Sequence, residues 1–488
     1  MNILGISAGF HDAGITLIND GEIVFAAHAE RYSKIKHDSE INREMLSECF
    51  DCFGEPTHIA YYERPWLKKT RQLYAGQYQD IFEPGIKHKL EQIWPREYMP
   101  EIEYHGHHLS HAAAGFQTSP YDDATVVVID AIGEWDTISI WDAEYINGKA
   151  KYKKLWSQKY PHSIGLFYSA MTKRAGLKPL DEEYILMGMA AYAMYDANMY
   201  GEFLHDAHDL NFRQNLHLGC DEYRPNMTNF EIAASAQYTL EQCLHHVMLR
   251  AEQIGRSKNL VYMGGVALNC KANDLIGPYF KNIWIMPNPS DCGSSLGAAA
   301  LSYGKKLNWQ NAYLGTDISG PYPTKELLDE LLTNKIVGVA SGRAEFGPRA
   351  LGNRSLLADP RGADIKDRVN AIKRRQEFRP FAPVILEELA HEYFDMPLGW
   401  PTSRYMQAVA YCKKPEQFPA IIHADRTSRV QTVPADGSGI RQLLEMWFEW
   451  TGCPMLLNTS LNIRGEPMVN DREDADRFEK LYGVRVLS

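Results

Sequence analysis

The sequence predicts an α/β protein with two domains, and three observations support this prediction. The chain has 488 residues, more than one ordinary hydrophobic core accommodates. Apolar strands such as NLVYM run through glycine turns into helices, a pattern typical of α/β folds. The pattern breaks where Gly315, Gly320, Pro321 and Pro323 cluster. We therefore expect one domain over residues 1–318 and a second over 319–488.

The first domain is expected to open with strands in sequence. MNILGIS and ITLIN are apolar runs separated by a turn, and Asp20-Gly21 then gives a strong hairpin signal before EIVFAAHAE. ATVVVID is typical of a buried strand and ends on Asp130. NLVYM and NIWIM are further strands, leading into the expected helices VALNCKANDLI and SSLGAAALSYG, the second with Asp291 near its N-cap. In the second domain, TKELLDELL predicts a helix and KIVGVASG a strand.

Composition excludes several classes of protein. The net charge of −11 argues against a general nucleic-acid binder, so no nucleic-acid polymer is expected as a partner. No apolar run approaches the roughly 18–20 residues of a membrane span, and MNILGIS lacks the features of a signal peptide. We expect a cytoplasmic protein with no membrane partner. The eight cysteines are scattered, which predicts reduced thiols.

Three histidines are packed into HHLSHAAAGF. On a helix, His107 and His111 lie at i and i+4, where two imidazoles can bind one metal ion. Asp130 and Asp291 end a strand and open a helix, and such ends converge in a twisted α/β sheet. This set suits iron(II), manganese or zinc. The alternative is a polar helix end or histidines satisfied in a core, and His108 is expected to be structural.

Two glycine-bounded turns are further candidates. His11-Asp12 lies between Gly9 and Gly14 in the first turn, where it can reach a bound phosphate, position a proton acceptor, or be an ordinary polar pair. The Gly264-Gly265 pair precedes an expected helix and can admit a phosphate near backbone N–H groups. The chain has no Walker-type GxxxxGK[ST] motif, so any ATP site uses another architecture.

Basic residues concentrate in the second domain. Residues 343–379 hold ten Lys/Arg against five Asp/Glu, which favours a site for a phosphate compound. Arg349 and Arg354 are planar donors suited to phosphate or carboxylate. The other candidates for this anion cage are Lys373, Arg375, Arg379, Arg429, Ser460, Asn462 and Arg464. No Ser-His or Cys-His nucleophile pattern is evident, so phosphate chemistry by positioning and charge neutralisation is expected.

Taken together, the motifs resemble one family. GFHDAG, HHLSHAAAGF, EEYILMGMAAY, GGVALNC, SDCGSSLGAA, EFGPRALGNRSLLADPR, FRPFAP, SRVQTV and NTSLNIRGEP are similar, in order, to the ATP-dependent O-carbamoyltransferases that include nodulation-factor and tobramycin carbamoyltransferases. The likeness runs through nearly the whole chain. It implies an N-terminal actin-like (ASKHA) two-lobed domain that binds metal and nucleotide, followed by a C-terminal YrdC-like α/β domain.

The resemblance also implies a reaction in two steps. The C-terminal domain would join carbamoyl phosphate to ATP, with Mg²⁺, forming carbamoyl-adenylate and releasing pyrophosphate. The N-terminal domain would transfer the carbamoyl group to an acceptor hydroxyl and release AMP. By motif position, His107, His111, Asp130 and Asp291 would hold Fe²⁺, with His11 and Asp12 catalytic, Gly264, Gly265 and Asn269 at the nucleotide, and Lys373, Arg429, Ser460 and Arg464 in the adenylation site.

Two residues depart from the family pattern, and the acceptor stays open. Ile185 replaces a frequent lysine, which puts one phosphate contact in doubt, and Gln376 replaces a frequent glutamate. The acceptor is expected to be a hydroxymethyl pyrimidine nucleotide or a natural-product sugar. His162 and Tyr168, in PHSIGLFYSAMT, are either acceptor contacts or ordinary packing. A homodimer is also considered.

Two other functions are weighed. A threonylcarbamoyl-transfer enzyme acting on tRNA would share both kinds of domain, but the acidic charge counts against tRNA binding. A non-catalytic ATP- or metal-binding protein on an actin-like frame would not need the basic loops of the second domain.

Overall fold

The computed structural model describes residues 1–206 and 208–488. A five-stranded sheet forms first, in the order β3-β2-β1-β4-β5. Strands β1 to β3 are antiparallel to one another, whereas β4 and β5 run parallel to β1. The β2–β3 turn has positive φ at Asp20 and Gly21, 46° and 96°, as a tight two-residue hairpin requires. The strands are β1 (Asn2–Ser7), β2 (Gly14–Asn19), β3 (Glu22–His28), β4 (His58–Tyr61) and β5 (Ile102–Tyr104).

A second five-stranded sheet repeats this pattern. Its order is β8-β7-β6-β11-β12, with β6 to β8 antiparallel and β11 and β12 parallel to β6. The strands are β6 (Asp123–Gly133), β7 (Asp136–Ile146), β8 (Lys149–Lys159), β11 (Asn259–Met263) and β12 (Asn282–Trp284). The N-terminal part of the chain therefore contains two sheets of the same order and strand directions. The predicted α/β class is confirmed.

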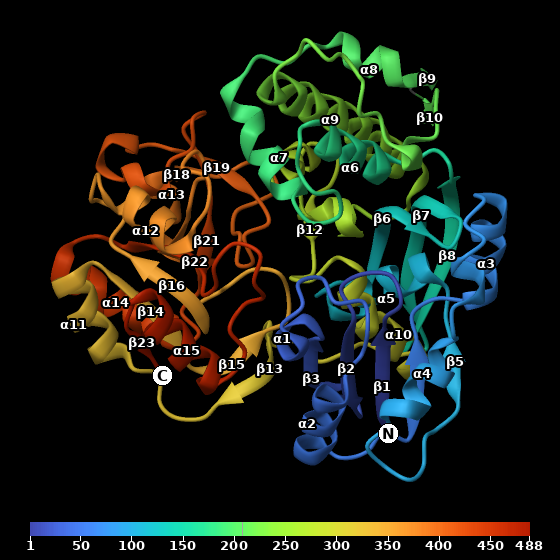
Figure 1. The fold of residues 1–488 in the computed structure, drawn as a ribbon, viewed down its shortest axis with the longest axis horizontal. Helices are drawn as coiled ribbons and strands as arrows, with labels where there is room; N and C mark the ends of the chain where they lie inside the picture. Colours follow the sequence, from blue (N-terminus) through green and yellow to red (C-terminus); the bar gives the residue numbers. More distant parts are fainter. Residues whose placement is uncertain (207) are drawn as a thin grey trace.

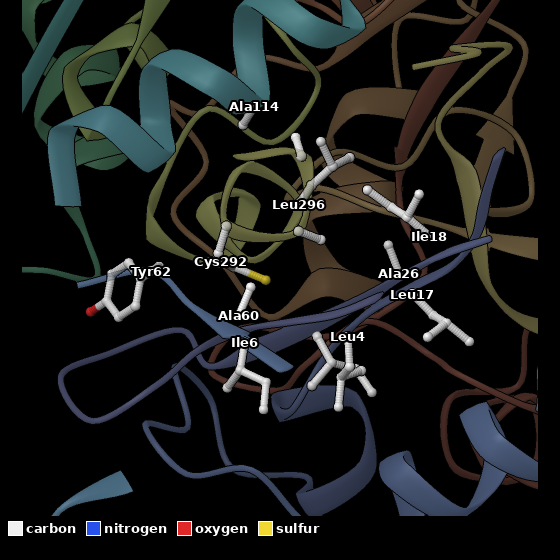
Figure 2. Packing of buried hydrophobic residues seen from close by; sticks show 14 of the residues in the cluster. Leu4, Ile6, Leu17, Ile18, Ala26, Ala60, Tyr62, Ala114, Cys292 and Leu296 are labelled. Carbon is white, nitrogen blue, oxygen red and sulfur yellow. The ribbon is translucent and has the colours of Figure 1, made fainter. Parts of the chain in front are cut away.

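Two helices lie between these sheets (Figure 1). Helix α5 (His107–Thr118) packs on β6 and β11, and α10 (Ser294–Tyr303) packs on β1, β2 and β4. The helices touch through their backbones: a Cβ added to Gly297 would lie 1.8 Å from the Ser110 carbonyl oxygen. Figure 2 shows Leu296 of α10 and Ala114 of α5 in the apolar layer above β1 and β2. The small residues of SSLGAAALSYG are explained by this close approach.

The predicted helix at VALNCKANDLI is wrong. Two short 3₁₀ segments form instead, Gly265–Leu268 and Ala272–Ile276. The Asn269 side chain accepts a hydrogen bond from the Ala272 N–H at 3.0 Å, and this local bond competes with a continuous helix. The remaining elements of this part are α1 (Glu30–Ser33), α2 (Arg43–Phe53), α3 (Pro65–Tyr74), α4 (Ile86–Ile93), α6 (Ile164–Arg174), α7 (Glu183–Met189), α8 (Asn198–Phe203), β9 (Leu204–Asp206), β10 (Asn211–Phe212) and α9 (Asn229–Ile254).

The C-terminal part, yellow to red in Figure 1, has a separate apolar core around a six-stranded sheet of order β21-β17-β22-β16-β14-β23. Helices α11 and α14 pack together, and Trp447 of α14 is fully buried. The strands are β13 (Tyr313–Ile318), β14 (Ile336–Ala340), β15 (Gly342–Glu345), β16 (Arg354–Ala358), β17 (Ala382–Leu386), β18 (Phe394–Asp395), β19 (Val409–Cys412), β20 (Thr427–Arg429), β21 (Gln431–Val433), β22 (Met455–Ser460) and β23 (Val486–Leu487). The helices are α11 (Thr324–Asn334), α12 (Ile365–Lys373), α13 (Ala390–Tyr393), α14 (Gly439–Thr451) and α15 (Arg472–Tyr482). Among the described residues, no helix is both long and apolar enough to cross a membrane.

Candidate functional site

The four predicted metal ligands come together between the two N-terminal sheets. His107 and His111 occupy the first turns of α5, and Asp291 lies just before α10. Asp130 lies in β6 immediately after Ile129, where the regular pairing of β6 with β7 is interrupted before it resumes at Gly133. The strand does not end at Asp130, as predicted, but continues to Gly133; the starts of the two helices and this irregular part of β6 nevertheless meet at one point.

The spacing of the four side chains suits ligation of a single metal ion. Nε2 of His107 lies 3.1 Å from Asp130 Oδ2 and 3.3 Å from Asp291 Oδ1. Nε2 of His111 lies 3.5 Å and 3.1 Å from the same two oxygens, and 3.2 Å from Nε2 of His107. A tetrahedral ion with bonds of about 2.1 Å separates its ligand atoms by about 3.4 Å. All four residues are at most 7% exposed, and this donor set fits a divalent metal.

A hydrogen bond orients His111, and a carboxylate lies close to His107. The Nδ1–H of His111 donates to the Pro289 carbonyl at 3.1 Å, which turns Nε2 toward the carboxylates. Glu63, 3% exposed, places Oε2 3.7 Å from His107 Nδ1 and accepts a hydrogen bond from Lys68 at 2.8 Å. Sequence reasoning missed Glu63. Its signal was its place two residues after the short strand β4, a strand of the first sheet.

His108, as expected, and Ser110 make structural contacts. His108 Nδ1 hydrogen-bonds the Ser139 hydroxyl at 2.7 Å, and burial holds the pKa of His108 well below its ordinary value. The Ser110 hydroxyl donates to the Tyr62 carbonyl at 2.9 Å and so fastens α5 to the chain after β4.

The His11-Asp12 pair lies in the β1–β2 turn, near the four predicted metal ligands, which we call the His/Asp cluster. His11 Nδ1 and Asp12 Oδ2 are 2.9 Å apart. Burial lowers the pKa of His11, but the hydrogen bond to Asp12 and the charge of Asp291 outweigh it, and the pKa rises to about 9. Asp12 adopts φ of 50°, a left-handed backbone conformation uncommon for a residue other than glycine.

The Gly264-Gly265 turn also borders this cluster. Gly264 has φ of 94°, and a Cβ there would lie 2.1 Å from the Ile129 carbonyl oxygen. The Gly265 N–H points to Asp130 Oδ1 at 3.4 Å. The Asn269 amide instead bonds Gln237 in both directions, at 3.0 and 3.1 Å. The nucleotide role of these three residues stays a prediction.

The two side chains predicted to contact the acceptor, Tyr168 and His162, have different hydrogen-bond partners. Tyr168 is 6% exposed and its hydroxyl donates to Gln237 at 2.7 Å, whereas His162 Nδ1 accepts from the Phe212 N–H at 3.1 Å. Both side chains therefore take part in packing contacts, and an acceptor role for them stays a prediction. Ile185 is fully buried in the same apolar core as Tyr168.

The predicted anion cage gathers five cations at the junction of the two parts. Lys373, 4% exposed, donates to the Ser460 hydroxyl at 3.0 Å and to Asn462 Oδ1 at 2.7 Å. Arg375 lies over Phe381, and Arg379 lies over Tyr184 of α7, which belongs to the N-terminal part. The other two are Arg349, which donates to the Leu268 carbonyl at 3.3 Å, and Arg429.

These five cations lack negative partners. In the described part of the chain, none of them forms an ion pair with a carboxylate. Burial and the charge of Arg429 lower the pKa of Arg349 to about 9. Burial, with Arg375 and Arg379 adding to it, holds the pKa of Lys373 well below its ordinary value. Five unpaired, partly buried cations at one place favour the binding of a polyanion, whose charge would neutralise theirs.

Three neighbouring side chains differ from expectation. Arg354 is fully buried and donates to five backbone carbonyls, including those of Asn470 and Thr316, so its predicted availability to phosphate is wrong. Its position at the start of β16 makes it structural. Arg464 pairs at 2.6 Å with Glu182, in the loop before α7. The Gln376 side-chain oxygen is buried without a hydrogen-bond partner among the described residues.

Family models match most of the chain. Residues 2–62 and 68–300 match the carbamoyltransferase N-terminus, and residues 328–487 match the carbamoyltransferase C-terminus. The chain belongs to the carbamoyltransferase family. It is therefore an enzyme of carbamoyl transfer, and the resemblance seen in the motifs is confirmed.

Three relatives and two solved structures place the carbamoyltransferase among known proteins. An uncharacterised Synechocystis protein is 32% identical over 98% of this chain and 94% of its own. Nodulation protein NolNO of Sinorhizobium fredii is 29% identical over 95% of this chain and 76% of its own. The 3'-hydroxymethylcephem-O-carbamoyltransferase of Amycolatopsis lactamdurans is 26% identical over 97% of this chain and 95% of its own. Component A of the Acidaminococcus fermentans (R)-2-hydroxyglutaryl-CoA dehydratase covers 62% of this chain and 98% of its own, with TM-score 0.37 and 16% identity. HypF of T. kodakarensis covers 62% of this chain and 47% of its own, with TM-score 0.32 and 14% identity.

Proposed function

We propose that this protein is an ATP-dependent O-carbamoyltransferase that works in two steps. Its C-terminal part, a YrdC-like domain over residues 319–488, makes carbamoyl-adenylate. Its N-terminal part, an actin-like domain over residues 1–318, transfers the carbamoyl group to an acceptor hydroxyl. The observation that carries the proposal is the anion cage, whose five cations have no carboxylate partner among the described residues, in a carbamoyltransferase that also has a buried His/Asp cluster.

In the first step, the cage binds carbamoyl phosphate and Mg²⁺-ATP. One water releases phosphate from carbamoyl phosphate, and the resulting carbamate oxygen attacks the α-phosphorus of ATP. Carbamoyl-adenylate forms and pyrophosphate leaves. Lys373 and the arginines neutralise the charge that accumulates on the phosphate oxygens, which is the main task of a protein in phosphoryl transfer.

In the second step, His11 accepts the proton of the acceptor hydroxyl. The hydroxyl oxygen bonds to the carbamoyl carbon, and the bond from that carbon to the AMP oxygen breaks. His107, His111, Asp130 and Asp291 would hold Fe²⁺, although Mn²⁺ or Zn²⁺ also fits this donor set. Such an ion would supply positive charge able to polarise the carbamoyl carbonyl.

The acceptor is proposed to be a small molecule with a free hydroxyl, either a hydroxymethyl pyrimidine nucleotide or a natural-product sugar. The cephem relative is named for an O-linked hydroxymethyl acceptor, which supports hydroxyl acceptors in general. A tRNA acceptor is disfavoured by the net charge of −11.

The test is incubation of metal-loaded protein with ATP and carbamoyl phosphate in the absence of acceptor. We expect pyrophosphate release that depends on carbamoyl phosphate, and a carbamoyl-adenylate mass. Pyrophosphate release that requires threonine and bicarbonate instead would favour threonylcarbamoyl chemistry. Lack of pyrophosphate release under both conditions, even with the two acceptor classes added, would contradict the proposal.

A further inference from the structure

A chain of hydrogen bonds leads away from His11 through three separate loops. Asp12 Oδ1 lies 2.7 Å from His37 Nδ1, and Asp12 Oδ2 lies 2.9 Å from His11 Nδ1. The other ring nitrogen of His37, Nε2, lies 2.8 Å from Asp181 Oδ1. Asp12 thus uses both carboxylate oxygens and His37 uses both ring nitrogens. The chain of hydrogen bonds runs from His11 through Asp12 and His37 to Asp181.

The positions of the protons in this chain follow from the two carboxylates on either side of His37. Ionised carboxylates only accept hydrogen bonds, so a histidine between two of them donates from both ring nitrogens. His37 is therefore an imidazolium cation, and the two carboxylates, opposing the effect of burial, raise its pKa to about 9. Burial lowers the pKa of His11, but Asp12 and Asp291 raise it to about 9, so His11 can act as a general base only after it has lost the proton on Nε2. In that form Nδ1–H still donates to Asp12, and the lone pair at Nε2 is free.

The backbone around the chain is held in an unusual conformation. Asp12 and His37 have φ of 50° and 56°, and such left-handed residues persist only where the surroundings impose them. The His37 N–H donates to Glu30 Oε2 at 3.0 Å. The Ala13 N–H donates to the Asp38 carbonyl at 2.7 Å, which joins the two loops directly.

A metal ion is not the explanation for this cluster. Asp12, Glu30 and His37 are close enough to share an ion. However, the Lys36 ammonium donates to both Glu30 oxygens, at 3.0 and 2.9 Å, and neither ring nitrogen of His37 has a free lone pair. The cluster is therefore built around its own cations.

We propose that His37 and Asp181 are positioning residues for His11 in the transfer step, an inference that rests on the proposed function. The His37 cation fixes the Asp12 carboxylate, and Asp181 fixes His37. Asp12 then holds His11 in the tautomer whose Nε2 faces the acceptor hydroxyl. As the new oxygen–carbon bond forms and AMP leaves, the proton from the hydroxyl moves to Nε2, and His11 later returns it to water.

The experiment compares Asp181→Ala and Asp181→Asn with the full-length parent, since Asn keeps an oxygen that can accept from His37. General bases contribute about 10²–10⁴-fold, and Asp12 remains in place, so Asp181→Ala should slow carbamoyl transfer by about 10- to 100-fold. Asp181→Asn should recover part of that loss. The KM for acceptor and the rate of carbamoyl-adenylate formation should not change in either variant.

Asp395→Ala is the matched control, because Asp395 forms an exposed pair with Lys413 at 3.1 Å in the C-terminal part. It should transfer at the parental rate. A transfer rate in Asp181→Ala equal to the parent would overturn the inference while leaving the proposed function intact. Equal losses in both half-reactions, or no gain from Asn over Ala, would assign Asp181 a merely structural role.

A second readout is independent of turnover. Imidazole protons bonded to carboxylates give strongly downfield proton NMR signals, and His11→Gln and His37→Gln identify the signals of each ring. In Asp181→Ala, the His37 signal should disappear and the His11 signal should shift. If the parent forms no carbamoyl-adenylate, the proposed function fails, and unchanged signals in Asp181→Ala would then overturn the hydrogen-bonded chain separately.

Discussion

Arg379→Met should stabilise the free protein while weakening its hold on polyanions. Arg379 lies 4.7 Å from the centre of the Tyr184 ring and forms no carboxylate pair among the described residues. Burial lowers its pKa, and Arg429 and Arg464 act in the same direction. This charge therefore lowers the free energy of unfolding, and a bound anion would remove that destabilisation.

The expected magnitude follows from two opposing effects. Two like charges about 8 Å apart repel by about 2 kcal/mol at an effective dielectric constant of about 20. Losing a partly exposed cation–π contact costs about 1 kcal/mol. The net gain in the free energy of unfolding is about 1 kcal/mol, which corresponds to a rise in Tm of about 2–4 °C for a unit the size of the C-terminal part.

The assay is thermal unfolding of the parent and Arg379→Met, with and without pyrophosphate. Pyrophosphate at about 100 times its Kd should stabilise the parent by about 2.7 kcal/mol and the variant by clearly less. Arg354→Met is the contrasting control. It removes five bonds to backbone carbonyls and should destabilise the protein by at least about 3 kcal/mol.

A lower Tm for Arg379→Met without ligand would refute this reasoning, because the arginine would then support the fold. Equal stabilisation of both proteins by pyrophosphate would refute it as well, since Arg379 would lie outside the anion site. Added salt should reduce the difference between the free proteins, because it screens the repulsion between partly exposed charges.

Three further predictions concern the N-terminal part. His111→Ala should lower bound metal, measured by elemental analysis, and stop transfer while carbamoyl-adenylate still forms; normal metal content would contradict the ligand assignment. Glu63→Gln should weaken metal binding by about 10- to 100-fold in a chelator competition, because the negative charge 3.7 Å from His107 Nδ1 is lost; parental affinity would argue against that contact. Burial lowers the pKa of His28 to about 4, below the ordinary value of about 6.5, so the unfolded chain takes up this proton first as the pH falls. Between pH 6 and pH 5, the parent should lose about 1 kcal/mol more unfolding free energy than His28→Gln in urea titrations, and equal losses would show that His28 is not buried uncharged.

Sequence patterns predict the ends of elements better than the environment of single side chains. The i, i+4 spacing of His107 and His111 and the position of Asp130 after an apolar run were sufficient to predict their convergence, because strand and helix ends meet at one sheet edge. Glu63 follows a short strand of the other sheet, HIAY, which gives a weak signal, and its approach to His107 exists only in the completed fold.

Charge alone is a poor guide to exposure. Arg349 and Arg354 lie in one basic, glycine-containing segment, and the sequence pattern does not distinguish them. Arg354 begins β16 and is enclosed by carbonyls from β13, from the start of β15 and from the segment before α15, which only the completed fold brings together. The same limit applies to His37 and Asp181, which lie 144 positions apart in the sequence but 2.8 Å apart in space.

The contact between α5 and α10 also constrains how the enzyme can move. Each helix is packed on its own sheet, and the Gly297–Ser110 approach leaves no room between their backbones. The two sheets therefore cannot swing apart about a hinge at this point without breaking the packed core that Figure 2 shows. Any opening around a substrate must therefore leave the contact between α5 and α10 intact.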